Sequence, residues 1–235
     1  MPNRIYEKRL LDQVHALSFA KKLIANLLVL ASILASSARA QSEKSENGDY
    51  LSILEKEVFR EINLARTQPA AYAVFVDDLK RYYKGKLLER PGEPTLLTEE
   101  GISAVAEAAR FLRAAKPVPA LVPSRGLSLA AKDHVRDQGP RGAIGHRSRD
   151  GSQIDDRINR YGRWLKAFGE NISYGEITAR MIVVVWIIDD GVPDRGHRQN
   201  IFEPDFRMAG IACGDHAAFK SMCVVDFVGG YQEGK

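Results

Sequence analysis

The 235-residue sequence lacks most of the features that mark a specialised class of protein. It has only two cysteines, and it shows no internal repeat and no low-complexity block. Repeat and low-complexity architectures are therefore excluded. With 45% hydrophobic and 27% charged residues, the chain has the composition of one globular domain that is long enough to bury a sizeable core.

Short motifs that announce an enzyme are also missing. The chain contains no HExxH, no CxxC and no GxSxG. Ser148 follows His146 by two positions, but no strand–turn–helix elbow is expected around it, so a serine nucleophile is not indicated. Neither cysteine is a candidate nucleophile, because each has a nearby partner for a disulfide.

A basic surface is absent once the N-terminus is set aside. The whole chain carries a formal charge of +4 and has a pI near 9.0. Residues 1–40 hold six basic and two acidic residues, which leaves 28 of each in the remainder. No basic run with interleaved aromatic residues follows, so the sequence predicts no nucleic-acid partner.

The long apolar run is confined to the N-terminus. Lys21 and Lys22 precede an apolar segment over residues 23–35, and small residues at Ala38 and Ala40 follow it. This is the pattern of a signal peptide over residues 1–40, and the run is shorter than the roughly 20 residues of a spanning helix. An uncleaved N-terminal anchor is the alternative. We expect a secreted protein, periplasmic or extracellular, with no integral membrane segment after cleavage.

The exported part divides into a linker, a domain and a tail. Residues 41–48 are polar and contain Ser and Gly, so we expect a linker without regular structure. The domain is predicted over residues 49–229, and residues 230–235 form a short tail.

The two cysteines, Cys213 and Cys223, both lie in the exported part. A pair of cysteines in an oxidising compartment most often forms a disulfide. The intervening Gly214, Asp215 and His216 predict a hairpin turn, and a bridge across it would stabilise the fold by about 2–3 kcal/mol. Two reduced, buried thiols are the alternative.

Helices are predicted first and strands last. Apolar residues spaced by three and four after Asp49, a plausible N-cap, predict a first helix, and further helices are expected after it. Their expected ranges are 69–79, 99–115 with Thr98 as N-cap, 124–138, 153–161 and 177–188. Residues 80–94 read as a loop and residues 116–124 as an extended connection. Strands are expected over residues 208–213 and 222–228. The order predicts an α+β fold with an antiparallel sheet covered by helices.

His146 and His197 stand out because each follows a glycine in a predicted loop. Two imidazoles with one or two carboxylates can form a divalent metal site or an acid–base pair. A satisfied structural role for the histidines is the alternative. Glu170 lies between Gly169 and Asn171, where it is either part of a turn or a carboxylate aimed into a cavity.

Asp189 and Asp190 lie at the predicted C-terminus of the helix over residues 177–188. Acids are unfavourable there because the helix dipole is negative at that end, so they need a partner. His197, Arg195 or Arg198 could supply one. For Asp190 we favour a solvated loop.

The order of several motifs resembles that of the CAP superfamily, the cysteine-rich secretory proteins, antigen five and pathogenesis-related proteins, also called SCP domains. The resemblance covers residues 50–229, and it includes a GEN signature and a W…HR-x-N-I block. The motifs are INLAR at 62–66 with Pro69, the alanine-rich LSLAAKDH at 127–134, GHRSRDG at 145–151, GENI at 169–172, Trp186 through GHRQNIF at 196–202, and AGIAC at 209–213.

This resemblance implies an α–β–α sandwich around a small antiparallel sheet. It also implies a cavity lined by two histidines and two acids, which correspond here to His146, His197, Glu170 and Asp189. Asp189 stands where many bacterial members have Ser and eukaryotic members have Glu. In the family, zinc or another divalent cation and sterol or lipid ligands have been associated with such domains.

Three functions are compatible with these residues. The favoured one is a secreted, non-enzymatic module that binds a metal ion, a lipid or a cell-wall-derived small molecule in the His/acid cavity. The second is a zinc-assisted hydrolase in which Glu170 activates a water held by the metal. In the third, the four polar residues only tie the GEN segment to the HRQN segment.

Overall fold

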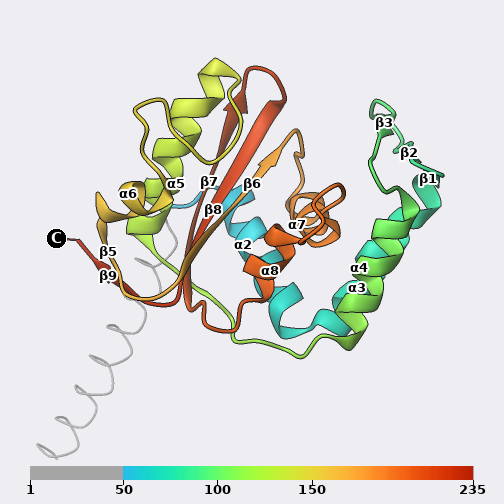
Figure 1. Ribbon diagram of the computed structural model, residues 1–235, viewed down its shortest axis with the longest axis horizontal. Helices are drawn as coiled ribbons and strands as arrows, with labels where there is room; N and C mark the ends of the chain where they lie inside the picture. Colours follow the sequence, from blue (N-terminus) through green and yellow to red (C-terminus); the bar gives the residue numbers. More distant parts are fainter. Residues whose placement is uncertain (1–49, 235) are drawn as a thin grey trace, which may run out of the picture. The chain divides into compact units, whose positions relative to one another are not determined.

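The central sheet of the computed structural model has four strands in the order β4-β7-β8-β6 (Figure 1). Strands β6, β7 and β8 are antiparallel, as predicted, whereas the short β4 runs parallel to β7. The sheet is therefore antiparallel except at this one edge. Its strands are β4 (Val122–Pro123), β6 (Phe168–Tyr174), β7 (Met208–His216) and β8 (Lys220–Val228).

The structure describes residues 50–234. The predicted signal peptide over residues 1–40, the linker over residues 41–48 and the proposed N-cap Asp49 lie outside the described residues. Within residues 50–234, no helix combines the length and the apolar character that crossing a membrane requires.

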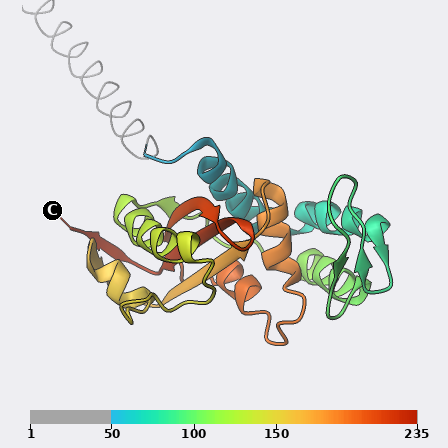
Figure 2. The same cartoon turned by 90° about the horizontal axis from the view of Figure 1, so that it is seen from above.

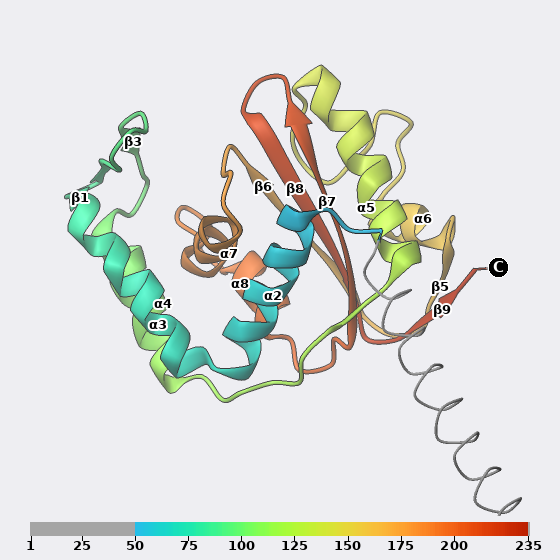
Figure 3. The ribbon, with the colours of Figure 1, turned by 180° about the vertical axis from the view of Figure 1, so that it is seen from behind.

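Helices cover both faces of the sheet, which confirms the α–β–α arrangement (Figures 1 and 3). α5 and α6 lie on one face, and α2, α7 and α8 lie on the other. α3 and α4 pack against each other and against α7. The helices are α2 (Ile53–Thr67), α3 (Pro69–Asp78), α4 (Ile102–Ala114), α5 (Arg125–Gln138), α6 (Ile154–Asn159), α7 (Ala179–Ile188) and α8 (Gly196–Phe202).

The strands divide their side chains between two apolar layers, as the period-two pattern of a strand requires. In β8, Cys223, Val225 and Phe227 join the core under α2 and α7, whereas Val224 packs toward α5. Gly210 of β7 faces α5 so closely that a Cβ there would lie 2.1 Å from the backbone of Leu127. Only glycine allows α5 to lie at this distance from the sheet.

The helix starts show where the sequence predictions were right and wrong. Ser52 caps α2 in a reciprocal capping box with Glu55, so the observed cap lies three residues beyond Asp49. Ser124 caps α5, as the predicted range implied. Thr98 does not cap α4, because its hydroxyl donates to the carbonyl oxygen of Lys86, and the helix begins at Ile102 rather than Glu99.

The prediction of a loop over residues 80–94 is wrong, because part of this segment forms regular secondary structure. A short 3-10 helix (Leu79–Tyr82) leads into a three-stranded antiparallel sheet. The sheet lies at one end of the α3–α4 pair (Figures 1 and 2). Its strands are β1 (Tyr83–Lys84), β2 (Leu87–Leu88) and β3 (Leu96–Leu97). Strands of two residues are too short to show a period in the sequence.

Four further predictions need correction. The GEN segment is not a turn, because residues 169–171 lie inside β6. The HRQN segment is helical, as α8, although His197 was predicted to lie in a loop. The β7–β8 turn lies at residues 217–219, after the predicted Gly214–His216, since β7 continues to His216. Residues 231–233 of the expected tail form β9 (Tyr231–Glu233), which pairs with β5 (Gly162–Trp164).

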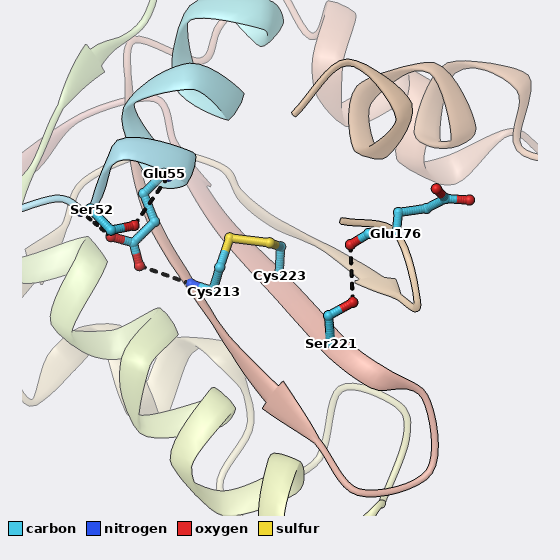
Figure 4. The surroundings of a disulfide bond; sticks show 6 residues. All are labelled: Ser52, Glu55, Glu176, Cys213, Ser221 and Cys223. Atoms are coloured by element: carbon cyan, nitrogen blue, oxygen red, sulfur yellow. Dashed lines mark hydrogen bonds between the residues drawn. A yellow bond between two sulfur atoms is a disulfide. The ribbon is translucent and has the colours of Figure 1, made fainter. Parts of the chain in front are cut away.

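The predicted disulfide is present between Cys213 and Cys223. The two residues are direct cross-strand partners, so the bond joins β7 to β8 within the hairpin (Figure 4). The backbone N–H of Cys213 also donates to the Glu55 carboxylate at 2.9 Å, which ties the start of α2 to the sheet (Figure 4).

Candidate functional site

The first imidazole–carboxylate pair joins His146 to Glu170. Nδ1 of His146 lies 2.8 Å from Oε1 of Glu170. Glu170 is buried in β6, whereas the His146 side chain is exposed in the loop between α5 and α6. The preceding Gly145 has φ of +94°, a left-handed conformation that favours glycine, which explains the Gly-His sequence at this point.

Arg157 of α6 binds the other oxygen of the Glu170 carboxylate. Its fully buried guanidinium lies 2.5 Å from Oε2 of Glu170 and also donates to the carbonyl oxygen of His146 at 3.0 Å. Burial by itself raises the pKa of Glu170, but the hydrogen bond from His146 and the charge of Arg157 outweigh it, so the net pKa is lowered. Glu170 is therefore an ionised carboxylate whose two oxygens are both engaged.

The second pair joins His197 to Asp189. Nδ1 of His197 lies 2.6 Å from Oδ1 of Asp189, and the backbone N–H of His197 donates to Oδ2 at 2.9 Å. Asp189 ends α7 in a left-handed conformation with φ of +54°, and His197 lies in the first turn of α8. The unfavourable acid at a helix C-terminus thus has the partner that the sequence suggested, because the chain turns back and presents His197 to it.

Two asparagines connect the pairs. Nδ2 of Asn171 donates to the carbonyl oxygen of His197 at 3.0 Å, and Nδ2 of Asn200 donates to that of Glu170 at 3.2 Å. The two amides also bond each other at 2.9 Å. A Cβ at Gly169 would lie 2.6 Å from the Asn200 side chain, so glycine is needed where α8 meets β6. The GEN and HRQN segments are therefore locked together.

Asp190 is not the solvated residue that the sequence favoured. Its carboxylate accepts hydrogen bonds from the backbone N–H groups of Glu99, Glu100 and Gly101, at 2.7, 2.9 and 3.2 Å. These groups precede the first turn of α4, where the helix dipole favours an anion. Asp190 therefore supplies the cap that Thr98 was expected to provide.

The four predicted site residues fit a closed metal site poorly. Both oxygens of Glu170 and both oxygens of Asp189 are already hydrogen-bonded. In residues 50–234, no three His, Cys, Asp or Glu side chains are grouped so that they could hold a metal ion. The atoms still available to a metal ion are Nε2 of His146 and Nε2 of His197. In each ring Nδ1 is hydrogen-bonded to a carboxylate, and this arrangement usually supports a metal-binding histidine.

A cleft of about 360 Å3 opens beside His197, and its lining is mainly apolar. One wall comes from β6 and α7, and the other comes from the β1–β3 sheet. The volume falls within the range of small-molecule sites, which lies at roughly 300–1,000 Å3. Apolar lining residues include Leu88, Leu96, Leu97, Ile172, Val185 and Ile188, and polar ones include Ser173, Glu176, Asp189 and His197.

Sequence reasoning found both histidines and their carboxylates but missed their supports. Asn200 was noted only as part of a motif, and Arg157 carried no signal, since a buried arginine looks like a surface one in a sequence. The apolar cleft could not be predicted, because the strands that form one wall were assigned to a loop. Trp186 was noted only as part of a motif, and the structure places it in the cleft wall.

Three solved bacterial structures are similar to this chain at low identity. An outer surface protein of Borrelia burgdorferi is 20% identical, with a TM-score of 0.41, and the match covers 50% of this chain and 80% of that one. An extracellular SCP-domain protein of Bacillus anthracis is 17% identical (TM-score 0.38; 54% and 37% covered). A cysteine-rich secretory protein of Staphylococcus aureus is 13% identical (TM-score 0.35; 55% and 38% covered). This chain thus spans less than two fifths of the length of the last two proteins.

No curated protein matches the sequence. The model of the cysteine-rich secretory protein family, CAP, matches residues 108–227, just over half of the chain. The matched part contains both imidazole–carboxylate pairs, the two asparagines and the disulfide. The chain therefore belongs to the cysteine-rich secretory protein (CAP) family.

Proposed function

We propose that this protein is a secreted, non-enzymatic module that binds a small, mostly apolar molecule, such as a lipid or a cell-wall-derived compound. The observation that carries this proposal is the apolar cleft with the His197–Asp189 pair in its wall. A concave apolar site with a few polar groups is the usual form of a small-molecule site. The predicted signal peptide and the disulfide support action outside the cytoplasm.

The contacts of Glu170 favour binding over the hydrolase alternative. A general base must have an oxygen free to take a proton, and its pKa should lie near the working pH. Both oxygens of Glu170 are engaged, by His146 and Arg157, and its pKa is lowered. Glu170 is thus built as an anchor for two side chains rather than as a base.

A dye-binding experiment tests the cleft. Leu96 lines it and is 54% exposed, so Leu96→Asp should leave the fold intact while placing a carboxylate against the ligand. We expect the neutral dye Nile red to bind the wild-type protein and to bind Leu96→Asp about tenfold more weakly, from the lost burial of one apolar side chain. The measurement is a fluorescence titration.

Leu165 provides a matched control, since it is 55% exposed and lies between β5 and β6, outside the cleft lining. Leu165→Asp should bind the dye like the wild type. Equal losses in both variants would mean that the dye adsorbs to exposed leucines in general, and the proposed cleft would then be rejected.

Zinc binding by His146 and His197 is a second candidate, favoured by the carboxylates that hold Nδ1 of each ring and leave Nε2 directed elsewhere. The residues offer two imidazoles at most, so affinity should be modest. In a competition titration with a zinc indicator, we expect His146→Ala/His197→Ala to lose the binding shown by the wild type. A double variant that binds zinc as well as the wild type would remove this candidate.

A further inference from the structure

Strand β6 forms an edge of the central sheet, on the side of α7 (Figure 1). In an antiparallel edge strand, alternate residues bond to the neighbouring strand, and the residues between them point their N–H and C=O groups away from the sheet. Just before β6, the carbonyl oxygen of Ala167 accepts from the N–H of Gly229. Just after β6, the N–H of Gly175 donates to the carbonyl oxygen of Ser221. Since the register between these points is unbroken, the outward residues of β6 are Phe168, Glu170, Ile172 and Tyr174.

The outer edge of β7 is blocked by side chains beyond the two residues that pair with β4. There, the N–H of Ile211 donates to Oγ of Ser128 at 3.0 Å. The N–H of Cys213 donates to the Glu55 carboxylate at 2.9 Å. Folded proteins block strand edges in such ways because an open edge can pair with another chain.

The outer edge of β6 is open where it borders the cleft. The carbonyl oxygen of Glu170 accepts from Asn200, but within residues 50–234 the outward N–H and C=O groups of Ile172 and Tyr174 have no partner. Ile172, Ser173 and Tyr174 all line the cleft, although successive side chains of a strand point to opposite faces. The Ile172 side chain packs in the layer under α5, on the face away from α7, so this residue borders the cleft with its backbone.

The lining of the cleft restricts what can pair with this edge. Among the described residues, no lysine or arginine lines it. Glu99 is exposed and forms no ion pair within residues 50–234. The cleft therefore favours a partner with apolar and basic side chains over an acidic one. The acidic lining residues are Glu99, Glu176, Asp189 and Asp190.

We propose that β6 accepts an extended peptide segment, which pairs with the outward backbone groups of Ile172 and Tyr174 and places apolar and basic side chains in the cleft. Strand addition to an open edge is a common mode of peptide recognition, in which backbone hydrogen bonds give affinity and pockets select the side chains. A second copy of this chain is a poorer occupant, because its own β6 borders the same cleft and is shielded by α7 and the β1–β3 sheet. The inference goes beyond the proposed function, since a lipid has no backbone that could extend a sheet.

Isothermal titration calorimetry of the full chain compares three acetylated and amidated hexapeptides. The probe alternates lysine and valine, the first control alternates glutamate and valine, and the second control is the probe with its internal amides N-methylated. N-methylation keeps every side chain and charge but removes the backbone donors. We expect the probe to bind at least tenfold more tightly than either control, from lost backbone hydrogen bonds in one and reversed charge in the other.

Three outcomes of the titration would overturn the proposal, namely no binding of the probe, equal binding of the N-methylated peptide, or equal binding of the glutamate peptide. Nile red separates this result from the proposed function. A protein that binds the dye but not the probe would lose only the peptide site, whereas one that binds the probe but not the dye would lose only the proposed function.

Amide hydrogen exchange, followed by NMR, locates the bound peptide. We expect the probe to slow exchange of the Ile172 amide at least tenfold and to leave Asn171 and Ser173 unchanged, because their N–H groups already bond to β8. An Ile172 amide that the probe does not slow would contradict the proposal. So would an Ile172 amide that is already as protected as Ser173 in the free protein, or one that becomes protected when two copies of the chain associate.

A charge reversal tests the cleft side of the site. Glu99→Lys should weaken binding of the lysine probe about fivefold, and Glu57→Lys, an equally exposed change on α2 outside the cleft lining, should bind like the wild type. Equal losses in both variants would show that the probe responds to net charge rather than to the cleft, and the proposed site would be rejected. Melting curves check that both variants fold.

Discussion

Asp226 is the most unusual single residue near the site. It is fully buried in β8 directly opposite Glu170, and neither of its carboxylate oxygens has a hydrogen-bond partner within residues 50–234. Burial and the neighbouring negative charge of Glu170 raise its pKa well above the ordinary value, and Arg157 only partly opposes them. A proton on Asp226 turns it into a donor toward Glu170, so the two side chains form one carboxyl–carboxylate unit.

Asp226→Asn should therefore change how stability depends on pH. Since the folded protein holds the Asp226 proton to a higher pH than the unfolded chain, its contribution is full below the unfolded pKa of about 3.9 and is lost as pH rises through the folded pKa. The asparagine amide donates to Glu170 at every pH. We expect the variant to match the wild type near pH 4 and to have the larger free energy of unfolding at pH 8.

Urea unfolding at both pH values measures this difference. Asp215→Asn serves as the control, because Asp215 is an exposed aspartate of the neighbouring strand β7. It should leave the pH dependence unchanged. A wild-type protein that gains as much stability as Asp226→Asn between pH 4 and 8 would show that Asp226 is not protonated in the fold.

At this scale the sequence revealed residues but not their environments. His146, His197, Glu170 and Asp189 were identified because they stand in glycine-rich or motif positions. Asp226 and Arg157 were not, since an acid in an apolar strand and an arginine in a short helix carry no local mark of burial. Their roles depend on a cross-strand pairing and a helix contact that only the fold creates.

Among the elements, α4 depends most on a residue that is distant in sequence. Asp190, which follows α7, accepts the N–H groups of residues 99–101. Arg195 from the same loop pairs with Glu100 at 2.5 Å. The start of α4 and the loop before α8 therefore form one unit, which also borders the cleft.

We expect Asp190→Ala to lower the free energy of unfolding by about 2 kcal/mol, at the upper end for an N-cap because one carboxylate serves three backbone donors. Thermal or urea unfolding measures the change. Asp194→Ala removes an exposed carboxylate from the same loop and should cost little. If the two variants lose equal stability, the cap contributes no more than loop charge does.

The elements that the sequence predicted well are those with a strong period or a local cap. α5 was expected from Ser124 to Gln138, and it begins one residue after its Ser124 cap. α8 was missed because it has seven residues and no side-chain cap, so the interaction between its Asn200 and β6 fixes its position rather than its own propensity. No strand was predicted at β6, because Gly169 and Asn171 suggest a turn, whereas the strand needs both for contact with α8.

Across the whole domain, the α+β class and the family were predictable, but the cleft was not. The resemblance rested on motifs within the matched part and on the INLAR segment before it. In the structure, Arg66 of that segment is fully buried, and its guanidinium donates to the carbonyl oxygens of Ile201 and Phe206. Motif residues thus hold the framework together, whereas the cleft depends on residues 83–97, which carry no motif.

The origin of the two cleft walls has a consequence for how such a protein can diversify. One wall, from β6 and α7, lies within the region that matches the family, and the other, from β1–β3, lies before it. Replacing the β1–β3 segment would change the shape of the cleft. It would leave unaltered the two imidazole–carboxylate pairs, the hydrogen bonds of Asn171 and Asn200, and the central four-stranded sheet. Under the proposed function, ligand choice would depend on a stretch of the chain that is separate from the family motifs, and a new specificity could arise by exchanging that one segment.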